Sequence, residues 1–209
     1  MISVYGIKIR DLPTVDRLES AICDPLLQSW RQKHGSAKND AYLRASLGGL
    51  WLLQQGGFCG AFGYGQNGRP ISADPAWDFN ITHTDDLVFC AVEHTDGVAP
   101  YFPRVGLDAE ALGRFSDSRR QALVERWCAP GEVAAYFARP TDEAFTRLWT
   151  KKEAYVKYRG DGLCGLRQDD VTALSAVRFF DYRIGDTLIT LCTHADGEAP
   201  TDVIFRTFA

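Results

Sequence analysis

The sequence predicts an α+β protein in which helices and antiparallel hairpins follow one another in mixed order. Two observations predict this class. Each half of the chain carries helical patterns and a strand–turn–strand pattern, and their order does not alternate as a parallel doubly wound sheet requires. The stretch from Asp96-Gly97 to Pro103 is rich in turn residues and is the candidate internal boundary. At 209 residues the chain suits one large domain or two small ones.

In the first part, apolar–polar alternation predicts an opening strand, and capping residues predict three helices. Gly48 and Gly49 lie inside the third helix, where each costs about 1 kcal/mol relative to Ala, so another element is expected to pack closely against that backbone. The last strand, LVFCAVE, is expected to be buried on both faces. The expected elements are a strand over 2–9, helices over 14–22, 24–35 and 39–56, a Gly-rich loop over 56–68, and hairpin strands over 77–84 and 87–93.

The second part is dominated by one long helix that opens at Pro140-Thr141. It carries acidic residues in its first turn and Lys157 and Arg159 in its last, which suits the helix macrodipole, and Gly160 ends it. The expected elements are a strand over 105–110, helices over 118–127, 130–137 and 141–159, hairpin strands over 177–184 and 188–193, and a closing strand over 203–208.

Composition excludes several classes of protein. The chain is 45% hydrophobic and 24% charged, which is typical of a globular protein and not of a disordered chain, a collagen or a coiled coil. It has neither a run of about 18–20 apolar residues nor the layout of a signal peptide, so no membrane association is expected. A net charge of −4 argues against a general nucleic-acid-binding surface. Six evenly spaced cysteines, without a CxxC pair or a Cys/His cluster, predict a reducing, cytoplasmic setting and no zinc site.

Two carboxylates are expected on one face of the strand VGLDAE. Side chains alternate along a strand, so Asp108 and Glu110 share a face, and Gly106 leaves space beside them. Carboxylates without a neighbouring His or Cys suit a hard cation, Mg²⁺ or Mn²⁺. The alternative is a strand face that is simply exposed to solvent.

The long helix carries the run WTKKEAYVK. Trp149, Glu153 and Lys157 form one stripe, because they follow one another at four-residue intervals. A surface Glu–Lys pair and a core tryptophan would also explain this spacing. Lys152 does not fit that explanation, since it falls on the apolar stripe of the helix and needs an anionic partner or a route to water.

Two further groups lie upstream. The segment Asn80-Ile81-Thr82-His83-Thr84 closes a hairpin strand, where a histidine near a turn needs no special role. A set of cations could together offer positive charge to a phosphate group. These are Arg44, with Arg31 and Lys33 upstream of it and Gly68-Arg69-Pro70 downstream.

The ordered set of VGLDAE followed by WTKKEAYVK resembles the 4′-phosphopantetheinyl transferases of the Sfp type. That family has a G-[IV]-D-x-E strand followed by W-x-x-K-E-A-x-x-K on a helix, and a G-K-P turn and an N-[IL]-S-H-S segment upstream. The chain departs from these patterns at Arg69, which replaces Lys, at Thr82 and Thr84, which replace Ser, and at Leu107. The resemblance spans about residues 40–160. It implies a pseudo-dimer of two ferredoxin-like halves in one chain, residues 1–100 and 101–209, with coenzyme A between them.

The resemblance also implies a reaction and a set of site residues. The reaction moves the phosphopantetheine arm of coenzyme A to a serine of an apo acyl or peptidyl carrier protein and releases 3′,5′-ADP. Asp108, Glu110 and Glu153 would hold Mg²⁺, with Glu153 as a metal ligand, the general base or both. The implied catalytic residues are Glu153, Lys157, Lys152 and Trp149. The implied coenzyme-binding residues are Arg44, Arg69, Pro70, Thr82, His83, Lys152 and Lys157.

The expected partners are coenzyme A and an acidic carrier protein that docks near Gly113 to Trp127, where Arg114, Arg119, Arg120 and Arg126 are found. Neither nucleic acid nor membrane is an expected partner, and two fused halves imply a monomer.

Two other functions fit the same residues. A Mg²⁺-dependent phosphodiesterase or nuclease would use the same carboxylates, although a nuclease normally shows a broader basic surface. A non-catalytic protein would hold coenzyme A without turnover.

Overall fold

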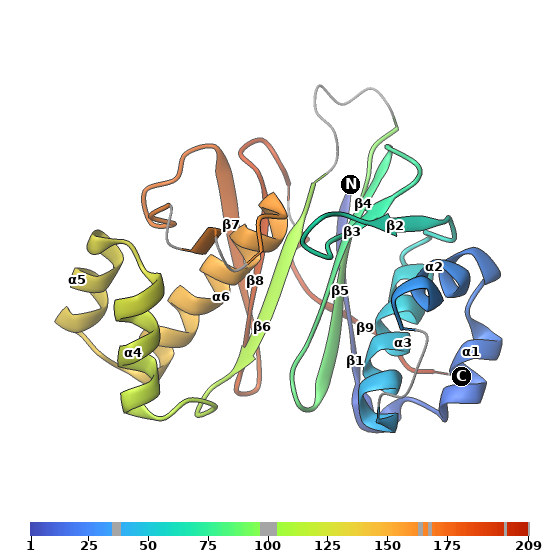
Figure 1. Cartoon of the computed structure of the whole chain (residues 1–209), viewed down its shortest axis with the longest axis horizontal. Helices are drawn as coiled ribbons and strands as arrows, with labels where there is room; N and C mark the ends of the chain where they lie inside the picture. The colour runs from blue at the N-terminus through green and yellow to red at the C-terminus, as the bar shows by residue number, and fades with distance from the viewer. Residues whose placement is uncertain (35–38, 97–103, 163–164, 167–168, 199, 209) are drawn as a thin grey trace. The chain divides into compact units, whose positions relative to one another are not determined.

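The computed structural model describes residues 1–34, 39–96, 104–162, 165–166, 169–198 and 200–208 (Figure 1). The chain divides into two compact units, which are Met1–Val105 with Glu198–Ala209, and Gly106–Gly197. Both units combine helices with mainly antiparallel sheets, so the mixed class predicted from the sequence is confirmed. The C-terminal residues belong to the first unit and not, as the predicted halves had it, to the second.

The first unit is built on a sheet with strand order β4-β5-β1-β9. Strands β1 and β4 run antiparallel to β5, and β9 runs parallel to β1. One face of the sheet contributes Tyr5, Ile7 and Phe79 to a hydrophobic core that it shares with the helices. The elements are β1 (Ile2–Lys8), a 3₁₀ turn (Ile9–Asp11), α1 (Val15–Ala21), α2 (Asp24–His34), α3 (Asp40–Gln55), β2 (Phe62–Tyr64), β3 (Pro70–Ser72), β4 (Trp77–His83), β5 (Leu87–His94) and β9 (Ile204–Phe205).

Helix α3 begins, ends and packs as its sequence predicts. The Asn39 side chain accepts a hydrogen bond from the Tyr42 N–H at 2.9 Å, and Gly56 is the C-cap. A Cβ atom on Gly48 would lie 2.7 Å from Leu12, and one on Gly49 would lie 2.5 Å from Ile81. The close packing expected at these two glycines is therefore confirmed.

Two expectations for the first unit were wrong. The segment 56–68, predicted as a Gly-rich loop, contains the strand β2, which pairs with β3 just beyond the segment. These strands have three residues each and too little alternation to be recognised. The closing strand was expected over 203–208, but β9 spans only Ile204–Phe205. Strand β9 pairs with β1, at the opposite end of the chain.

The second unit contains the sheet β6-β8-β7, in which both pairs are antiparallel. Helix α6 packs on this sheet with one face, where Ala154 contacts Val177 and Cys192. Its other face contributes Phe145 and Trp149 to a core shared with α4 and α5. The elements are β6 (Gly106–Ala111), α4 (Asp117–Trp127), α5 (Pro130–Ala138), α6 (Asp142–Arg159), β7 (Val177–Ile184) and β8 (Thr187–His194).

The two units share one order of connections (Figure 1). Each begins with a strand, β1 or β6, and continues through three helices, of which the last is the longest. Each later forms a hairpin whose second strand pairs with the opening strand, which gives the orders β4-β5-β1 and β7-β8-β6. The described parts of the two units thus share this order of elements, apart from the hairpin β2–β3 and the strand β9 of the first unit.

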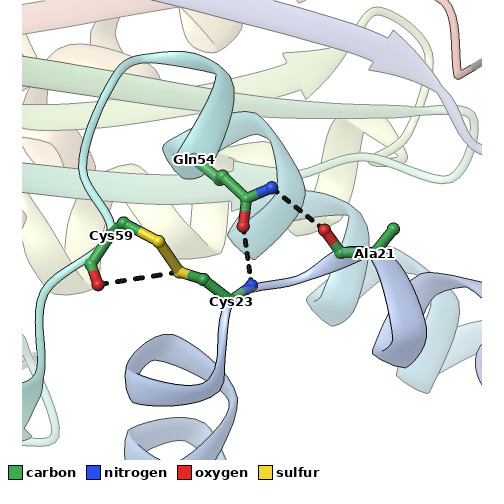
Figure 2. The surroundings of a disulfide bond; sticks show 4 residues. All are labelled: Ala21, Cys23, Gln54 and Cys59. Atoms are coloured by element: carbon green, nitrogen blue, oxygen red, sulfur yellow. Dashed lines mark hydrogen bonds between the residues drawn. A yellow bond between two sulfur atoms is a disulfide. The ribbon is translucent and has the colours of Figure 1, made fainter.

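A disulfide joins Cys23 to Cys59, with their Cα atoms 6.2 Å apart. Figure 2 shows how Gln54 supports it: its side-chain oxygen accepts from the Cys23 N–H at 2.7 Å, and its amide donates to the Ala21 carbonyl at 3.0 Å. This bond is at odds with the reducing setting expected from the cysteine spacing, in which disulfides are rare. The sequence did not reveal it, because 36 residues separate the two cysteines and only the fold brings them together. Cys90 and Cys192 are buried free thiols. No helix of the described residues is both long and apolar enough to span a bilayer.

Candidate functional site

The two carboxylates of β6 lie on the face that α6 covers. Asp108 is 5% exposed and Glu110 is 8% exposed, so the alternative of a solvent-exposed strand face is wrong. The Lys157 ammonium of α6 lies 2.6 Å from Asp108 Oδ1 and 3.1 Å from the Leu107 carbonyl. Glu110 forms an ion pair with Arg114 from the turn after the strand. Both acids are therefore buried beside a cation.

Gly106 explains how α6 can approach β6 so closely. A Cβ atom on Gly106 would overlap the Ala154 carbonyl and the Tyr158 amide, and would lie 2.9 Å from the Tyr158 Cα. The space expected beside the carboxylates is thus filled by the helix backbone and not by solvent. Gly106 and Ala154 carry no chemistry of their own, but their small size lets Lys157 reach Asp108.

Glu153 lies one turn before Lys157 on α6 and is electrostatically coupled to the same carboxylates. Burial, followed by the charge of Asp108, raises the pKa of Glu153 to about 7, with Lys157 acting in the opposite direction and Glu110 adding to the rise. Burial and the charge of Asp108 likewise raise the pKa of Glu110, against the lowering effect of Arg114 and Lys157. The structure therefore brings Asp108, Glu110, Glu153 and Lys157 together.

The carboxylates fit a hard divalent cation by their chemistry, although their present geometry does not form a site. Among the described residues, no group of three or more His, Cys, Asp or Glu side chains is arranged to hold a metal ion. Burial, followed by the charge of Asp108, raises the pKa of both Glu110 and Glu153, so these acids provide oxygen ligands whose repulsion a cation would relieve. Asp108 and Glu110 instead pair with Lys157 and Arg114.

Lys152 has an anionic partner inside the protein. Its ammonium, 1% exposed, lies 2.6 Å from Glu132 Oε2 and 3.1 Å from the Asp169 carbonyl. Glu132 is itself fully buried and accepts the N–H groups of Ala129 and Val171 at 2.7 and 2.8 Å. This internal ion pair accounts for the place of Lys152 on the apolar stripe, and the contact of Lys152 with coenzyme phosphate stays a prediction.

Trp149, the other motif residue expected to be catalytic, lies in the core of the second unit. It is 8% exposed and stacks on Phe145, with the ring centroids 5.8 Å apart. Its observed contacts are those of a packing residue.

Two of the predicted phosphate-binding arginines make internal contacts. Arg44 donates to the carbonyls of Ile9 and Pro13, each at 3.1 Å, and to that of Leu12. It thereby satisfies the backbone that follows β1, and its contact with the 3′-phosphate stays a prediction. The Arg69 side chain, 8% exposed, forms an ion pair with Asp78. Neither guanidinium is presented as a freely exposed cation.

The remaining upstream residues lie on strands or turns of the first unit. Thr82 is 7% exposed on β4, and His83, at the end of that strand, is exposed and contacts the Tyr42 ring edge-on at 6.4 Å. Pro70 opens β3. Lys33 donates to the Gly68 carbonyl at 3.2 Å and therefore lies at the 68–70 turn. Arg31 pairs with Glu19 at 2.8 Å.

The arginines expected to dock a carrier protein differ in their surroundings. Arg120 is 8% exposed and pairs with Asp117 and with Asp142, the latter at 3.0 Å, so it stabilises the start of α4 and is corrected as a docking residue. Arg119 is exposed, and Arg126 lies 4.9 Å from the centre of the Trp127 ring. These two cations remain at the surface of α4.

Sequence reasoning missed the partners of the buried cations. Glu132 and Asp78 were not singled out, and Arg114 was not expected to pair with Glu110. A cation on an apolar stripe, as at Lys152, shows that a partner is needed, but it does not show which acid supplies it. An acid within a buried strand, as at Asp78, was the signal available for the pair with Arg69.

Comparison with known proteins matches part of the chain to one family. A family model described as the 4'-phosphopantetheinyl transferase superfamily matches residues 104–200. The 4'-phosphopantetheinyl transferase HetI of Nostoc sp. is 32% identical over 136 residues, which cover 62% of this chain and 53% of HetI. The 4'-phosphopantetheinyl transferase AcpT of Salmonella typhimurium is 31% identical over 135 residues, 62% of this chain and 65% of AcpT.

A 4'-phosphopantetheinyl transferase of Bacillus subtilis is 27% identical over 134 residues, 62% of this chain and 54% of that protein. The chain thus matches less than two thirds of the length of each of these relatives. The family match includes both β6 and α6, on which the predicted resemblance depends most. The resemblance predicted from the sequence is therefore confirmed, since residues 104–200 match the model of the 4'-phosphopantetheinyl transferase superfamily and these relatives carry that name.

Proposed function

We propose that this protein transfers the 4′-phosphopantetheine arm of coenzyme A to a serine hydroxyl of an apo carrier protein, with release of 3′,5′-ADP. The observation that carries the proposal is the meeting of Asp108 and Glu110 of β6 with Glu153 and Lys157 of α6, within the matched family region. Acids and an ammonium side by side suit a reaction at a pyrophosphate, where negative charge must be neutralised and a hydroxyl proton accepted.

Asp108, Glu110 and Glu153 are proposed to hold Mg²⁺ or Mn²⁺. When bound, this ion would neutralise charge on the pyrophosphate and polarise it toward attack. In the structure, Asp108 pairs with Lys157 and Glu110 pairs with Arg114. The two cations therefore lie where the proposed reaction requires positive charge. The Lys157 side chain is 28% exposed. When coenzyme binds, Lys157 is proposed to leave its ion pair with Asp108 and to contact a phosphate oxygen of the coenzyme.

Glu153 is proposed as metal ligand, general base or both. A base must be ionised at the working pH and yet retain affinity for a proton, and a pKa near neutrality provides this balance. Burial beside Asp108 supplies the rise in the pKa of Glu153. Trp149 and Lys152 contribute by packing α6 and pairing with Glu132, so their catalytic importance is proposed to be indirect.

Coenzyme binding is proposed for the first unit at the 68–70 turn and the end of β4. Pro70 and the turn backbone would flank the adenine, while His83 and Thr82 would lie toward the 3′-phosphate. Lys33, at the same turn, is the exposed cation best placed to add charge there. The carrier protein is proposed to dock on α4 through Arg119 and Arg126, since carrier proteins are usually acidic.

The repeated order of strand, three helices and hairpin supports a further proposal, that the chain is a pseudo-dimer of two related halves. In each unit the opening strand pairs with the second hairpin strand. A protein that supplies both halves from one chain has no need of a second copy, so we propose a monomer.

Intact-mass spectrometry tests the proposed reaction. The protein is incubated with Mg²⁺, coenzyme A and a panel of apo carrier proteins, and a carrier is expected to gain about 340 Da, the mass of the arm. Asp108→Ala is expected to abolish the gain, whereas Asp186→Ala, at an exposed hairpin turn, leaves it unchanged. Coenzyme binding without any gain would favour a non-catalytic binding protein. Cleavage of coenzyme or nucleic acid without a carrier would favour a phosphodiesterase.

A further inference from the structure

The first unit buries a pair of carboxylates to which the proposed reaction gives no role. Asp78 on β4 and Glu93 on β5 lie directly opposite each other, 9% and 1% exposed. Like charges that face each other across a strand pair destabilise a sheet, and burial adds to the cost. Such a pair of carboxylates is stable only where hydrogen-bond donors compensate their buried charge.

Those donors come from the segment that leads into β6. Glu93 Oε2 accepts the Arg104 N–H at 2.6 Å, and Asp78 Oδ2 accepts the Val105 N–H at 2.7 Å. Two successive backbone amides are thus held by side chains of the sheet and not by a neighbouring strand. The residue that follows them, Gly106, begins the strand that carries the β6 carboxylates.

Arg69 contacts two of the same residues, Asp78 and Val105. Its guanidinium pairs with Asp78 Oδ2 and donates to the Val105 carbonyl at 3.1 Å. Asp78 Oδ2 therefore receives both the Arg69 guanidinium and the Val105 amide, while Arg69 also holds the carbonyl of Val105. A guanidinium holds its donors in one rigid plane, so these contacts determine where the 68–70 turn lies.

We propose that Asp78 is a positioning residue, which holds the coenzyme-flanking turn 68–70 and residues 104–105 in one arrangement. This inference rests on the proposed function for the role of the turn. Asp78 contacts neither coenzyme nor carrier in this arrangement. Its loss loosens two segments that are more than 30 residues apart in the sequence, and weakens coenzyme binding through Arg69.

Asp78→Asn tests the inference, because asparagine keeps an acceptor oxygen and nearly the same volume while removing the charge. Amide hydrogen exchange in peptides covering 62–72 and 104–110 is expected to accelerate together, by roughly tenfold or more, while α3 is unchanged. The Kd of coenzyme A, measured by calorimetry, is expected to rise by a similar factor. The matched control is Asp74→Asn, an exposed acid that accepts the Ala76 N–H at 2.9 Å, and it should change neither readout.

A second variant keeps the test valid if Asp78→Asn does not fold. Arg69→Met combined with Asp78→Asn removes both buried charges and keeps the acceptor for Val105, so a folded protein with a loosened turn is expected. Wild-type exchange in both segments and an unchanged Kd would overturn the inference. If wild-type protein does not bind coenzyme A at all, the proposed function fails, and the coupled exchange of the two segments still decides whether Asp78 positions them.

Discussion

Glu153 is partly buried beside Asp108 and Glu110, and this environment makes its ionisation oppose folding. Its pKa rises from the ordinary 4.5 to about 7 in the folded protein. Between these values the folded state binds more protons than the unfolded state, so the free energy of unfolding falls as pH rises through this window. The residue best suited to act as a base is thus one that destabilises the protein at neutral pH.

Glu153→Gln removes this cost, since glutamine does not ionise. At pH 8 in metal-free buffer, the variant is expected to be more stable than wild type by roughly 2–3 kcal/mol, and the difference should vanish near pH 4.5. Denaturant unfolding at both pH values measures it. Added Mg²⁺ should stabilise wild type at pH 8 and not the variant.

The control on the same helix is Glu143→Gln. Glu143 is exposed and pairs with Arg147, which lowers the pKa of Glu143, so its replacement should bring no gain in stability at pH 8. Equal stability of wild type and Glu153→Gln at pH 8 would contradict the burial of that charge.

Burial and internal contacts also matter for several cations of the predicted site. Arg44, Arg69 and Lys152 each suggested a phosphate ligand by charge and spacing, yet each is held by internal carbonyls or carboxylates. Removing one partner of a buried pair typically costs about 3–5 kcal/mol. Loss of activity in such variants would therefore report on folding before it reports on substrate contact.

At the scale of elements, the site depends on the close crossing of β6 and α6. Gly106→Ala would place a methyl group against the backbone of Ala154 and Tyr158, and backbone cannot rotate out of the way as a flexible side chain can. We expect a loss of about 3 kcal/mol or more in unfolding free energy, and a loss of transfer activity as Lys157 moves from Asp108.

Denaturant unfolding and the mass assay measure the two effects of Gly106→Ala. Gly63→Ala on β2 is the control, because a Cβ atom there meets nothing within 4 Å. A fully stable and active Gly106→Ala protein would show that the helix does not need to lie this close to the strand.

At the scale of the whole molecule, the chain consists of two units that are stabilised by different means. The disulfide between Cys23 and Cys59 closes a loop of 36 residues within the first unit, whereas Cys128 and Cys192 of the second unit are free thiols. A loop of this length is worth about 3–4 kcal/mol in the chain-entropy account of disulfides.

Reduction with a dithiol is therefore expected to destabilise the first unit by about this amount and to leave the second unit unchanged. Hydrogen exchange resolved by peptide, in α3 for the first unit and α6 for the second, distinguishes them. In a Cys23→Ser, Cys59→Ser protein the reductant should have no effect. Equal destabilisation of both units would show that they unfold together.

The sequence alone determined the helices, the longer strands, several helix caps and the residues proposed to carry chemistry, but not the short strands β2, β3 and β9. Local rules suffice there: Thr141 accepts from the Ala144 amide, Gly160 takes a left-handed φ of 82°, and alternation places Asp108 and Glu110 on one strand face. The spacing of the helix residues likewise brings Glu153 and Lys157 to the same site.

Only the tertiary structure decided which charges meet. Glu132 is 20 residues from Lys152, Cys23 is 36 residues from Cys59, and β9 joins the strand at the opposite end of the chain. Pairing at such separations depends on how helices and sheets pack, because a buried charge takes whichever partner the packing brings near. The local sequence pattern therefore identified the carboxylates and cations of the site. Packing decided which of them meet at the proposed reaction site and which form internal ion pairs.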